Sequence, residues 1–223
     1  MNLALFDLDH TLIPFDSGMA WTRFLTSRGI LPPEAPETYL AYCHDYVAGT
    51  LDIRAMHRAT VKPLSRYPLE QIAAWGRAFE AEMAPQVPAE MKALVMRHQA
   101  AGDLCAIVTA TERFIAEPFG RLFGLAHVVA TQAETRHGFV TGEIAGEPCY
   151  REHKRTHVDH WLAAPPLQVT KGLAAFEQSW FYSDSAGDLP LLNAVSKPVA
   201  VRPDPALRAH ALRAGWPVLD QGP

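Results

Sequence analysis

Two carboxylates stand two residues apart behind a short apolar run, and no other residues of this chain are better placed to do chemistry. The run is Leu3–Phe6, and Asp7 and Asp9 follow it. An unbroken apolar run of this length is typical of a buried parallel strand. Open α/β sheets place their chemistry at the carboxyl ends of such strands. Like charges this close repel each other unless a cation or a proton lies between them.

Magnesium is the simplest cation for this pair, because it is a hard ion that prefers carboxylate and carbonyl oxygens. An aspartate beside such an ion can attack phosphorus and form an acyl phosphate. A plainer interpretation also exists, in which an Asp-x-Asp after a strand serves only to cap the next helix. The rest of the chain favours the chemical interpretation.

Further polar residues stand behind or between later apolar runs that predict strands. They are Thr109, which ends a predicted strand over residues 104–109, Lys154, and a second acidic pair, Asp184 and Asp188. Each of these residue types is common alone, since a threonine often ends a strand and a lysine usually lies at the surface. Four such motifs in a fixed order are far more specific than any one of them.

This order resembles the haloacid dehalogenase superfamily of phosphohydrolases, and phosphoserine phosphatase and its relatives in particular. The resemblance covers residues 1–14 and about 88–220. The residues that carry it are Asp7, Asp9, Thr11, Thr109, Lys154, Asp184 and Asp188.

The resemblance implies a role for each acidic residue. Asp7 is the expected nucleophile, and Asp9 is the expected general acid and base, whose backbone carbonyl also contacts the metal. With Asp7 and Asp9, Asp184 is the expected third protein ligand of Mg²⁺. Asp188 is expected to position the metal ligands, or a water on the metal, without binding the metal itself. Its plainer role is to cap the next helix, and both roles can hold together.

The resemblance also implies a phosphate-binding set. Thr109 would donate its hydroxyl to a phosphate oxygen beside the N–H of Ala110, and Lys154 would hold another oxygen. Arg155 directly follows Lys154, so the sequence leaves open which of the two contacts the phosphate. Thr11 is placed among the substrate-binding residues.

Substrate recognition is expected from the segment that follows the first strand. In phosphoserine phosphatases an early Glu and a deeper Arg hold the amino acid. These positions fall here at Asp16 and near Thr60, with Arg58 and Lys62 on either side. Gly187 stands where that branch usually has Asn. We therefore expect Asp16, Arg58 and Lys62 to contact substrate, and Asp16 favours a cationic group such as an amine or imidazole.

The sequence thus predicts an enzyme, a Mg²⁺-dependent phosphomonoesterase for a small phosphorylated metabolite. Phosphoserine and histidinol phosphate, or another phosphorylated amine, fit about equally well. A phosphotransferase would use the same residues. A catalytically weak sensor of a phosphorylated ligand is the third alternative, which Gly187 and the altered recognition residues would permit.

The predicted fold is α/β, a doubly wound parallel sheet with an inserted helical-bundle cap. Residues 15–87 carry apolar side chains at helical spacing between breakers such as Gly29 and Pro32, with no strand candidate. From residue 88 helical and strand patterns alternate. We therefore expect residues 1–14 and 88–223 to form the catalytic core and residues 15–87 to form the cap.

Composition excludes several other classes. The chain has 223 residues and a net charge of −4, so no basic surface indicates nucleic acid. No apolar stretch approaches the ~20 residues of a membrane helix, and no signal peptide is visible. Three scattered cysteines fit a reducing compartment. We expect a cytoplasmic protein with no membrane or nucleic-acid partner, and the sequence leaves its oligomeric state open.

Overall fold

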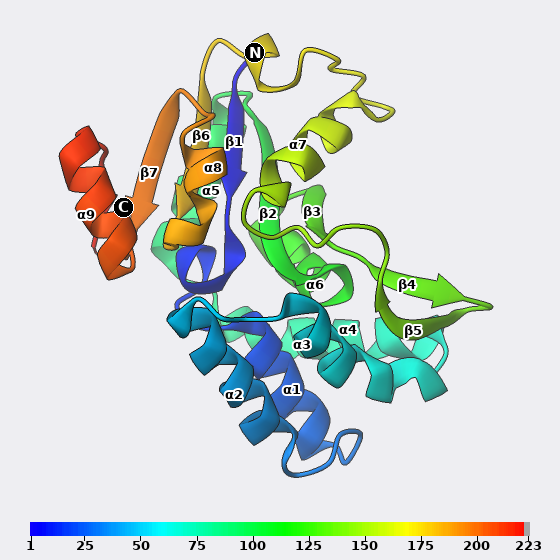
Figure 1. Ribbon diagram of the computed structural model, residues 1–223. Coiled ribbons are helices and arrows are strands. Elements are labelled where there is room, and N and C mark those ends of the chain that lie inside the picture. The colour runs from blue at the N-terminus through cyan, green and yellow to red at the C-terminus, as the bar shows by residue number, and fades with distance from the viewer. Residues whose placement is uncertain (221–223) are drawn as a thin grey trace.

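A computed structural model describes residues 1–220 of the chain (Figure 1). Six parallel strands form one sheet in the order β3-β2-β1-β6-β7-β8. This confirms the predicted doubly wound parallel sheet. The strands are β1 (Leu3–Phe6), β2 (Leu104–Glu112), β3 (His127–Thr131), β6 (Ser179–Ser183), β7 (Lys197–Val201) and β8 (Val218–Leu219).

Helices cover both faces of this sheet because its central strands are apolar on both sides. Successive residues of a strand point to opposite faces, so Phe6 and Ile107 join one buried cluster while Leu5 and Val108 join the other. The first cluster includes side chains of α5 (Ala89–Ala100) and α6 (Arg113–Phe123). The second includes side chains of α7 (His153–Ala163), α8 (Leu189–Leu192) and α9 (Pro205–Ala214).

Four helices lie between β1 and α5 in the chain, at the end of the sheet toward which β1 points (Figure 1). They are α1 (Ser17–Ser27), α2 (Ala35–Ala48), α3 (Ile53–Val61) and α4 (Leu69–Met83), and we call them the inserted helices. Asp16 caps the start of α1, Asp52 caps α3, and Gly49 ends α2 in the left-handed conformation. The predicted helices therefore form.

The inserted helices share one apolar core with the sheet. Phe79 of α4 is fully buried and packs edge-on against Trp21, Phe24 and Phe119, the last of these from α6. Burying aromatic rings of this size supplies much of the energy that holds such layers together. That residues 15–87 act as a separate cap domain remains a prediction.

A hairpin joins the sheet region to the inserted helices. Its strands, β4 (Ala133–Arg136) and β5 (Phe139–Ile144), pair antiparallel. The backbone N–H of Leu69 donates to the carbonyl of Gly138 at 2.9 Å. Gly142 has φ +91°, and a Cβ there would lie 2.7 Å from the Cβ of Lys62, so the two backbones are in close contact.

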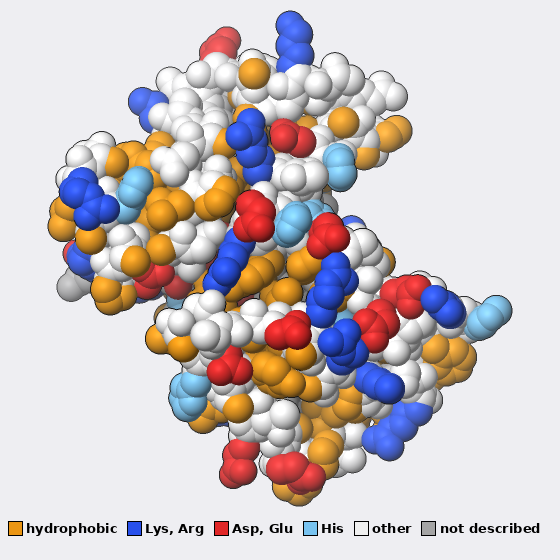
Figure 2. All heavy atoms as spheres, in the orientation of Figure 1, with side chains coloured by type: hydrophobic (Ala, Val, Ile, Leu, Met, Phe, Trp, Pro, Cys, Tyr) orange, Lys and Arg blue, Asp and Glu red, His pale blue; other side chains and the backbone are white. Residues whose placement is uncertain are grey.

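Ion pairs span the same contact. Arg54 pairs with Glu147 at 3.0 Å, and Arg58 pairs with Glu143 at 3.3 Å. Figure 2 shows acidic and basic side chains mixed on this face of the molecule. Such exposed pairs each contribute little, so the close backbone contact at Gly142 defines the junction.

Short helical turns complete the fold. They are η1 (Leu8–Leu12), η2 (Lys62–Arg66), η3 (Ala84–Gln86), η4 (Gly172–Ala175) and η5 (Ala186–Asp188). Within residues 1–220, no helix combines the length and apolar character that crossing a bilayer requires.

One predicted boundary is wrong. The sequence predicts that the second core strand ends at Thr109, but β2 continues to Glu112. The apolar run stops at Val108, and the strand then carries polar residues beyond the buried sheet, with a shift of register against β3. This extension brings additional polar side chains to the end of the sheet.

Candidate active site

The predicted catalytic residues meet at the carboxyl ends of the three central strands. β1 lies between β2 and β6, so Asp7 after β1, Thr109 in β2 and Asp184 after β6 come from neighbouring strands. The chain order reverses at β1 and β6, which is where open α/β sheets bind ligands. A cavity of about 530 Å³ opens there, and its lining includes Asp7, Asp9, Thr109, Lys154 and Asp184.

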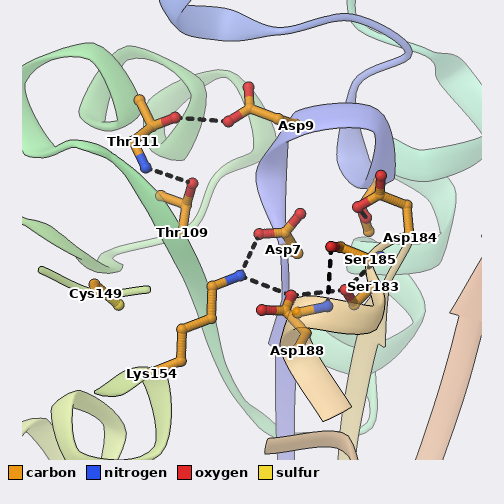
Figure 3. Close-up of polar contacts among 12 residues, drawn as sticks. Asp7, Asp9, Thr109, Thr111, Cys149, Lys154, Ser183, Asp184, Ser185 and Asp188 are labelled. Carbon is orange, nitrogen blue, oxygen red and sulfur yellow. Dashed lines mark hydrogen bonds and ion pairs between the residues drawn. The ribbon is translucent and has the colours of Figure 1, made fainter. Parts of the chain in front are cut away.

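Lys154 bridges two of the acidic residues (Figure 3). Its Nζ donates to Oδ1 of Asp7 and to Oδ2 of Asp188, both at 2.7 Å. Burial alone would lower the pKa of Lys154, but the carboxylates of Asp188 and Asp7 raise it well above its usual value. The side chain is therefore held as an ammonium. The neighbouring Arg155 is largely exposed and lies toward Asp159 instead.

Asp188 is held on a second side by Ser183. The Ser183 hydroxyl donates to the same Oδ2 at 2.7 Å. Asp188 does occupy the N-terminal position of α8, but its side chain makes no capping hydrogen bond there. Asp188 is thus the N-cap residue of α8 by position, while its carboxylate contacts the Lys154 ammonium and the Ser183 hydroxyl.

Lys154 alone does not balance the acidic cluster. Burial raises the pKa of Asp7 to about 7 even though Lys154 opposes the shift. Burial, followed by the nearby charge of Asp7, raises the pKa of Asp184 to about 8. Carboxyl groups shifted this far indicate that a further positive charge would stabilise them in the ionised form.

The donor set fits Mg²⁺. Asp7 and Asp184 supply carboxylate oxygens at adjacent strand ends, and the backbone carbonyl of Asp9, two residues after Asp7, is the third expected ligand. No group of three acidic, histidine or cysteine side chains within residues 1–220 converges as a metal site. Magnesium commonly takes one or two carboxylates and keeps several waters, so two side chains and a carbonyl suffice. Thr11 donates to Oδ1 of Asp184 at 3.3 Å.

The side chain of Asp9 is held apart from this cluster. One carboxylate oxygen accepts from the N–H of Ser17 and the other from the hydroxyl of Thr111, both at 2.6 Å. The turn at Leu8–Leu12 makes this possible, since Asp9 is extended and His10 adopts φ 55°. Figure 3 shows Asp9 reaching toward Thr111 on β2.

The sequence analysis did not identify Ser17 and Thr111 as contacts of Asp9. Thr111 follows Thr109 by two residues, so the period of a strand places both on the same face of β2. That spacing could have identified Thr111. No comparable signal marks Ser17, which acts through its backbone.

Thr109 and Ala110 both line the cavity, as expected for groups that contact a phosphate. Thr109 is almost fully buried, and its hydroxyl accepts from the N–H of Thr111 at 3.1 Å. A hydroxyl has one proton to donate besides the lone pairs that accept. Thr109 therefore keeps its donor available at the cavity.

Asp16 also lines the cavity. One carboxylate oxygen accepts from the N–H of Met19 at 2.7 Å and from the hydroxyl of Tyr39 at 2.9 Å. Burial, and then the nearby Asp9, raises the pKa of Asp16 to about 6. At neutral pH the side chain is therefore largely an anion facing the cavity.

The structure does not bring Arg58 and Lys62 to the cavity. They line a separate depression, and Arg58 pairs with Glu143. The reason is helical phase: His57 and Val61 turn one face of α3 inward, and the next residue along is rotated by about 100° onto another face. Thr60, which lies between the two basic residues, does line the cavity.

Gly187 sits beside a contact between the inserted helices and the sheet. The hydroxyls of Tyr46 and Ser185 are 2.6 Å apart and share a hydrogen bond. A Cβ at Gly187 would lie 3.3 Å from the Ser185 hydroxyl and 3.9 Å from that of Tyr46. A longer side chain at position 187 would therefore compete with this hydrogen bond.

Comparison with known proteins decides the family. A family model described as haloacid dehalogenase-like hydrolase matches residues 4–193. The chain belongs to this family. The predicted resemblance and the predicted phosphatase class are therefore confirmed for this haloacid dehalogenase-like hydrolase.

Its relatives include two phosphatases of defined name. It is 41% identical to a histidinol-phosphatase of Neisseria meningitidis, over 98% of both chains. It is 29% identical to the phosphoserine phosphatase SerB1 of Mycobacterium tuberculosis, over 97% of this chain and 70% of the relative.

Solved structures agree with this fold. A Bordetella pertussis protein of unknown function superposes with a TM-score of 0.88 at 40% identity, covering 98% of both chains. A phospho-aspartyl intermediate analogue of a phosphoserine phosphatase superposes with a TM-score of 0.67 at 17% identity, covering 99% of this chain and 93% of that one. The second likeness is one of fold.

Proposed function

We propose that this haloacid dehalogenase-like hydrolase is a Mg²⁺-dependent phosphomonoesterase that acts through an aspartyl phosphate on Asp7, and that its substrate is histidinol phosphate or a closely similar phosphorylated amine. One observation carries the proposal. Asp7 follows the central strand of the sheet, at the floor of a cavity, with a buried ammonium 2.7 Å from one of its oxygens.

Asp7 and Asp184, with the backbone carbonyl of Asp9, would hold the metal. When bound, Mg²⁺ would supply positive charge to the transferring phosphoryl group and to these carboxylates. Lys154 supplies a second positive charge. It contacts one oxygen of Asp7, and the other oxygen would act as the nucleophile toward phosphorus.

Asp9 is the proposed general acid and base. The contacts from Ser17 and Thr111 fix its carboxylate beside the cavity. In the first step it gives a proton to the leaving alkoxide. In the second step it takes a proton from the water that attacks the aspartyl phosphate. Thr109, the N–H of Ala110 and Lys154 would hold the phosphate oxygens, where charge spreads during transfer.

The inserted helices are the proposed cap, which would cover the site and exclude water during the reaction. They contribute Tyr39 and His57 to the cavity lining, and Asp16, the residue before α1, lines it too. Recognition of the alcohol part of the substrate is assigned to this side, since the sheet side carries the phosphate chemistry.

The histidinol-phosphatase relative supports the choice of substrate, because its similarity extends over 98% of both chains. The acidic Asp16 supports a substrate with a protonated nitrogen. Phosphoserine is the competing substrate. Its carboxylate would need a cation. Arg58 and Lys62, which the sequence suggested for this role, lie outside the cavity, and Arg23 of α1 lines it.

The test is phosphate release from histidinol phosphate, phosphoserine and p-nitrophenyl phosphate, each with Mg²⁺ and with EDTA. Asp7→Asn keeps the shape of the side chain but removes the nucleophilic oxygen. We expect it to lower turnover by 10³-fold or more, about 4 kcal/mol of transition-state stabilisation. Asp45→Asn, at an exposed position of α2, is the matched control.

Beryllium fluoride gives an independent check, because it should be trapped at Asp7. Normal turnover by the Asp7→Asn variant would refute the covalent mechanism. No phosphate release from any of the three substrates would favour a sensor. Product phosphorylation that rises with an added alcohol would favour a phosphotransferase.

A further inference from the structure

A buried polar pair lies in the wall of the same cavity, away from the phosphate-binding residues. Nδ1 of His57, on α3, hydrogen-bonds to Oε1 of Glu112, at the end of β2. Both residues line the cavity, and their exposed fractions are only 3% and 9%. The pair therefore joins an inserted helix to the sheet in the wall of a cavity with many apolar side chains.

Each member of the pair keeps one polar atom without a partner. Nε2 of His57 and Oε2 of Glu112 are buried, and neither has a hydrogen bond within residues 1–220. A buried polar atom left unpaired costs free energy, so native proteins contain few of them and each needs an explanation. Thr26 Oγ1 is the third such atom among the described residues, and Thr26 does not line the cavity.

The two unpaired atoms have matching hydrogen-bonding character. When Nδ1 of a neutral His57 donates to Glu112, its Nε2 is an acceptor, and Oε2 of an ionised Glu112 is an acceptor too. Two acceptors on one hydrogen-bonded pair, one of them carrying negative charge, suit a ligand with N–H donors and a positive charge. A ligand that lacks donors would leave both atoms unsatisfied.

The distance from the phosphate-binding residues also restricts the ligand. Glu112 lies three residues beyond Thr109 on β2, which corresponds to at most about 10 Å along a strand. In histidinol phosphate five bonds separate phosphorus from the imidazole ring, about 6–7 Å when extended. In phosphoserine four bonds separate phosphorus from the amine, about 5 Å. The longer molecule reaches further toward Glu112.

We propose that His57 and Glu112 are the specificity-determining contact for the nitrogen-bearing end of the substrate, a protonated imidazole or amine that donates N–H groups to Nε2 of His57 and Oε2 of Glu112. This inference rests on the proposed phosphatase function and adds to it the recognition of the alcohol part. Neither residue is among those assigned to the phosphoryl group, so both would select the substrate and take no part in the chemistry.

Glu112→Gln tests the proposal, because it keeps the shape of the side chain and removes the charge. We expect KM for histidinol phosphate to rise at least tenfold, while kcat/KM for p-nitrophenyl phosphate stays within twofold of the wild type. Glu90→Gln, at an exposed position of α5, is the matched control. Inhibition by free histidinol should weaken in parallel with the rise in KM.

A double variant separates recognition from folding. His57→Phe with Glu112→Leu replaces the pair by apolar side chains, a change that is often neutral or stabilising for buried polar pairs. We expect an unchanged or higher Tm together with the same loss of selectivity. This variant also keeps the test valid if Glu112→Gln alone does not fold.

Several outcomes would overturn the proposal. An unchanged KM for histidinol phosphate in Glu112→Gln would show that the pair only joins α3 to β2. An equal loss on both substrates would show the same. A wild-type enzyme that hydrolyses p-nitrophenyl phosphate but does not prefer histidinol phosphate would refute the recognition of a cationic nitrogen. A wild-type protein that hydrolyses neither would refute the proposed function itself.

Discussion

Replacing Lys154 by Met should destabilise the protein strongly, even in the absence of substrate. Met keeps an apolar stem of similar length, but it removes the ammonium, which lies 5.7 Å from the centre of the Phe181 ring and donates to Asp7 and Asp188 at 2.7 Å. Both carboxylates are less than 10% exposed, so water cannot replace the lost charge. Removing one partner of a buried ion pair typically costs about 3–5 kcal/mol.

The size of the effect can be measured by thermal and urea unfolding, followed by circular dichroism at pH 7.5 with EDTA. For a chain of this length, 1 kcal/mol corresponds to about 2–4 °C, so Tm should fall by about 6–20 °C. Lys92→Met, at an exposed position of α5, is the matched control and should change Tm very little.

A second variant tests the cause of the destabilisation. Adding Asp188→Asn to Lys154→Met removes one of the two uncompensated carboxylates, so part of the lost stability should return. If Lys154→Met unfolds within about 1 kcal/mol of the wild type, or if the double variant recovers nothing, the argument from buried charge is wrong.

Two further predictions concern stability. Gly142→Ala should lower the free energy of unfolding in urea by more than about 2 kcal/mol, because a Cβ at φ +91° meets Lys62. Gly29→Ala, at φ +67° with open space around it, should lower it by only about 1 kcal/mol. Equal losses would refute the close contact. Asp16→Asn should stabilise the protein by about 1–3 kcal/mol at pH 8. The folded-state pKa of Asp16, about 6, exceeds the ordinary value of 3.8, so ionisation of Asp16 costs folding stability as pH rises through 6. The gain should vanish near pH 4, and a gain independent of pH would contradict this sign.

The sequence was sufficient for the parts of the site that follow directly from strand ends. Asp7, Thr109 and Asp184 each stand behind an apolar run, and parallel strands must bring such positions to one edge. Lys154 came from a family motif, and only the geometry shows that Lys154 and not Arg155 turns inward.

The recognition side of the cavity was harder to predict. Arg58 and His57 are adjacent in the chain, and only the phase of α3 against the hairpin decides which one turns inward. Glu112 was not identified from the sequence because the apolar run ends at Val108, and no local pattern indicates that β2 continues. These positions depend on packing between distant segments, which no window of sequence contains.

The junction at Gly142 also bears on how this protein can be recombined. Swapping only residues 15–87 between relatives would place a different residue at position 62, where Lys62 now lies against Gly142. The hairpin of β4 and β5 should therefore be exchanged together with α3 and η2 as one module. In a lineage, substitutions on either side of this junction should occur in compensating pairs, although some eighty residues separate them in the chain.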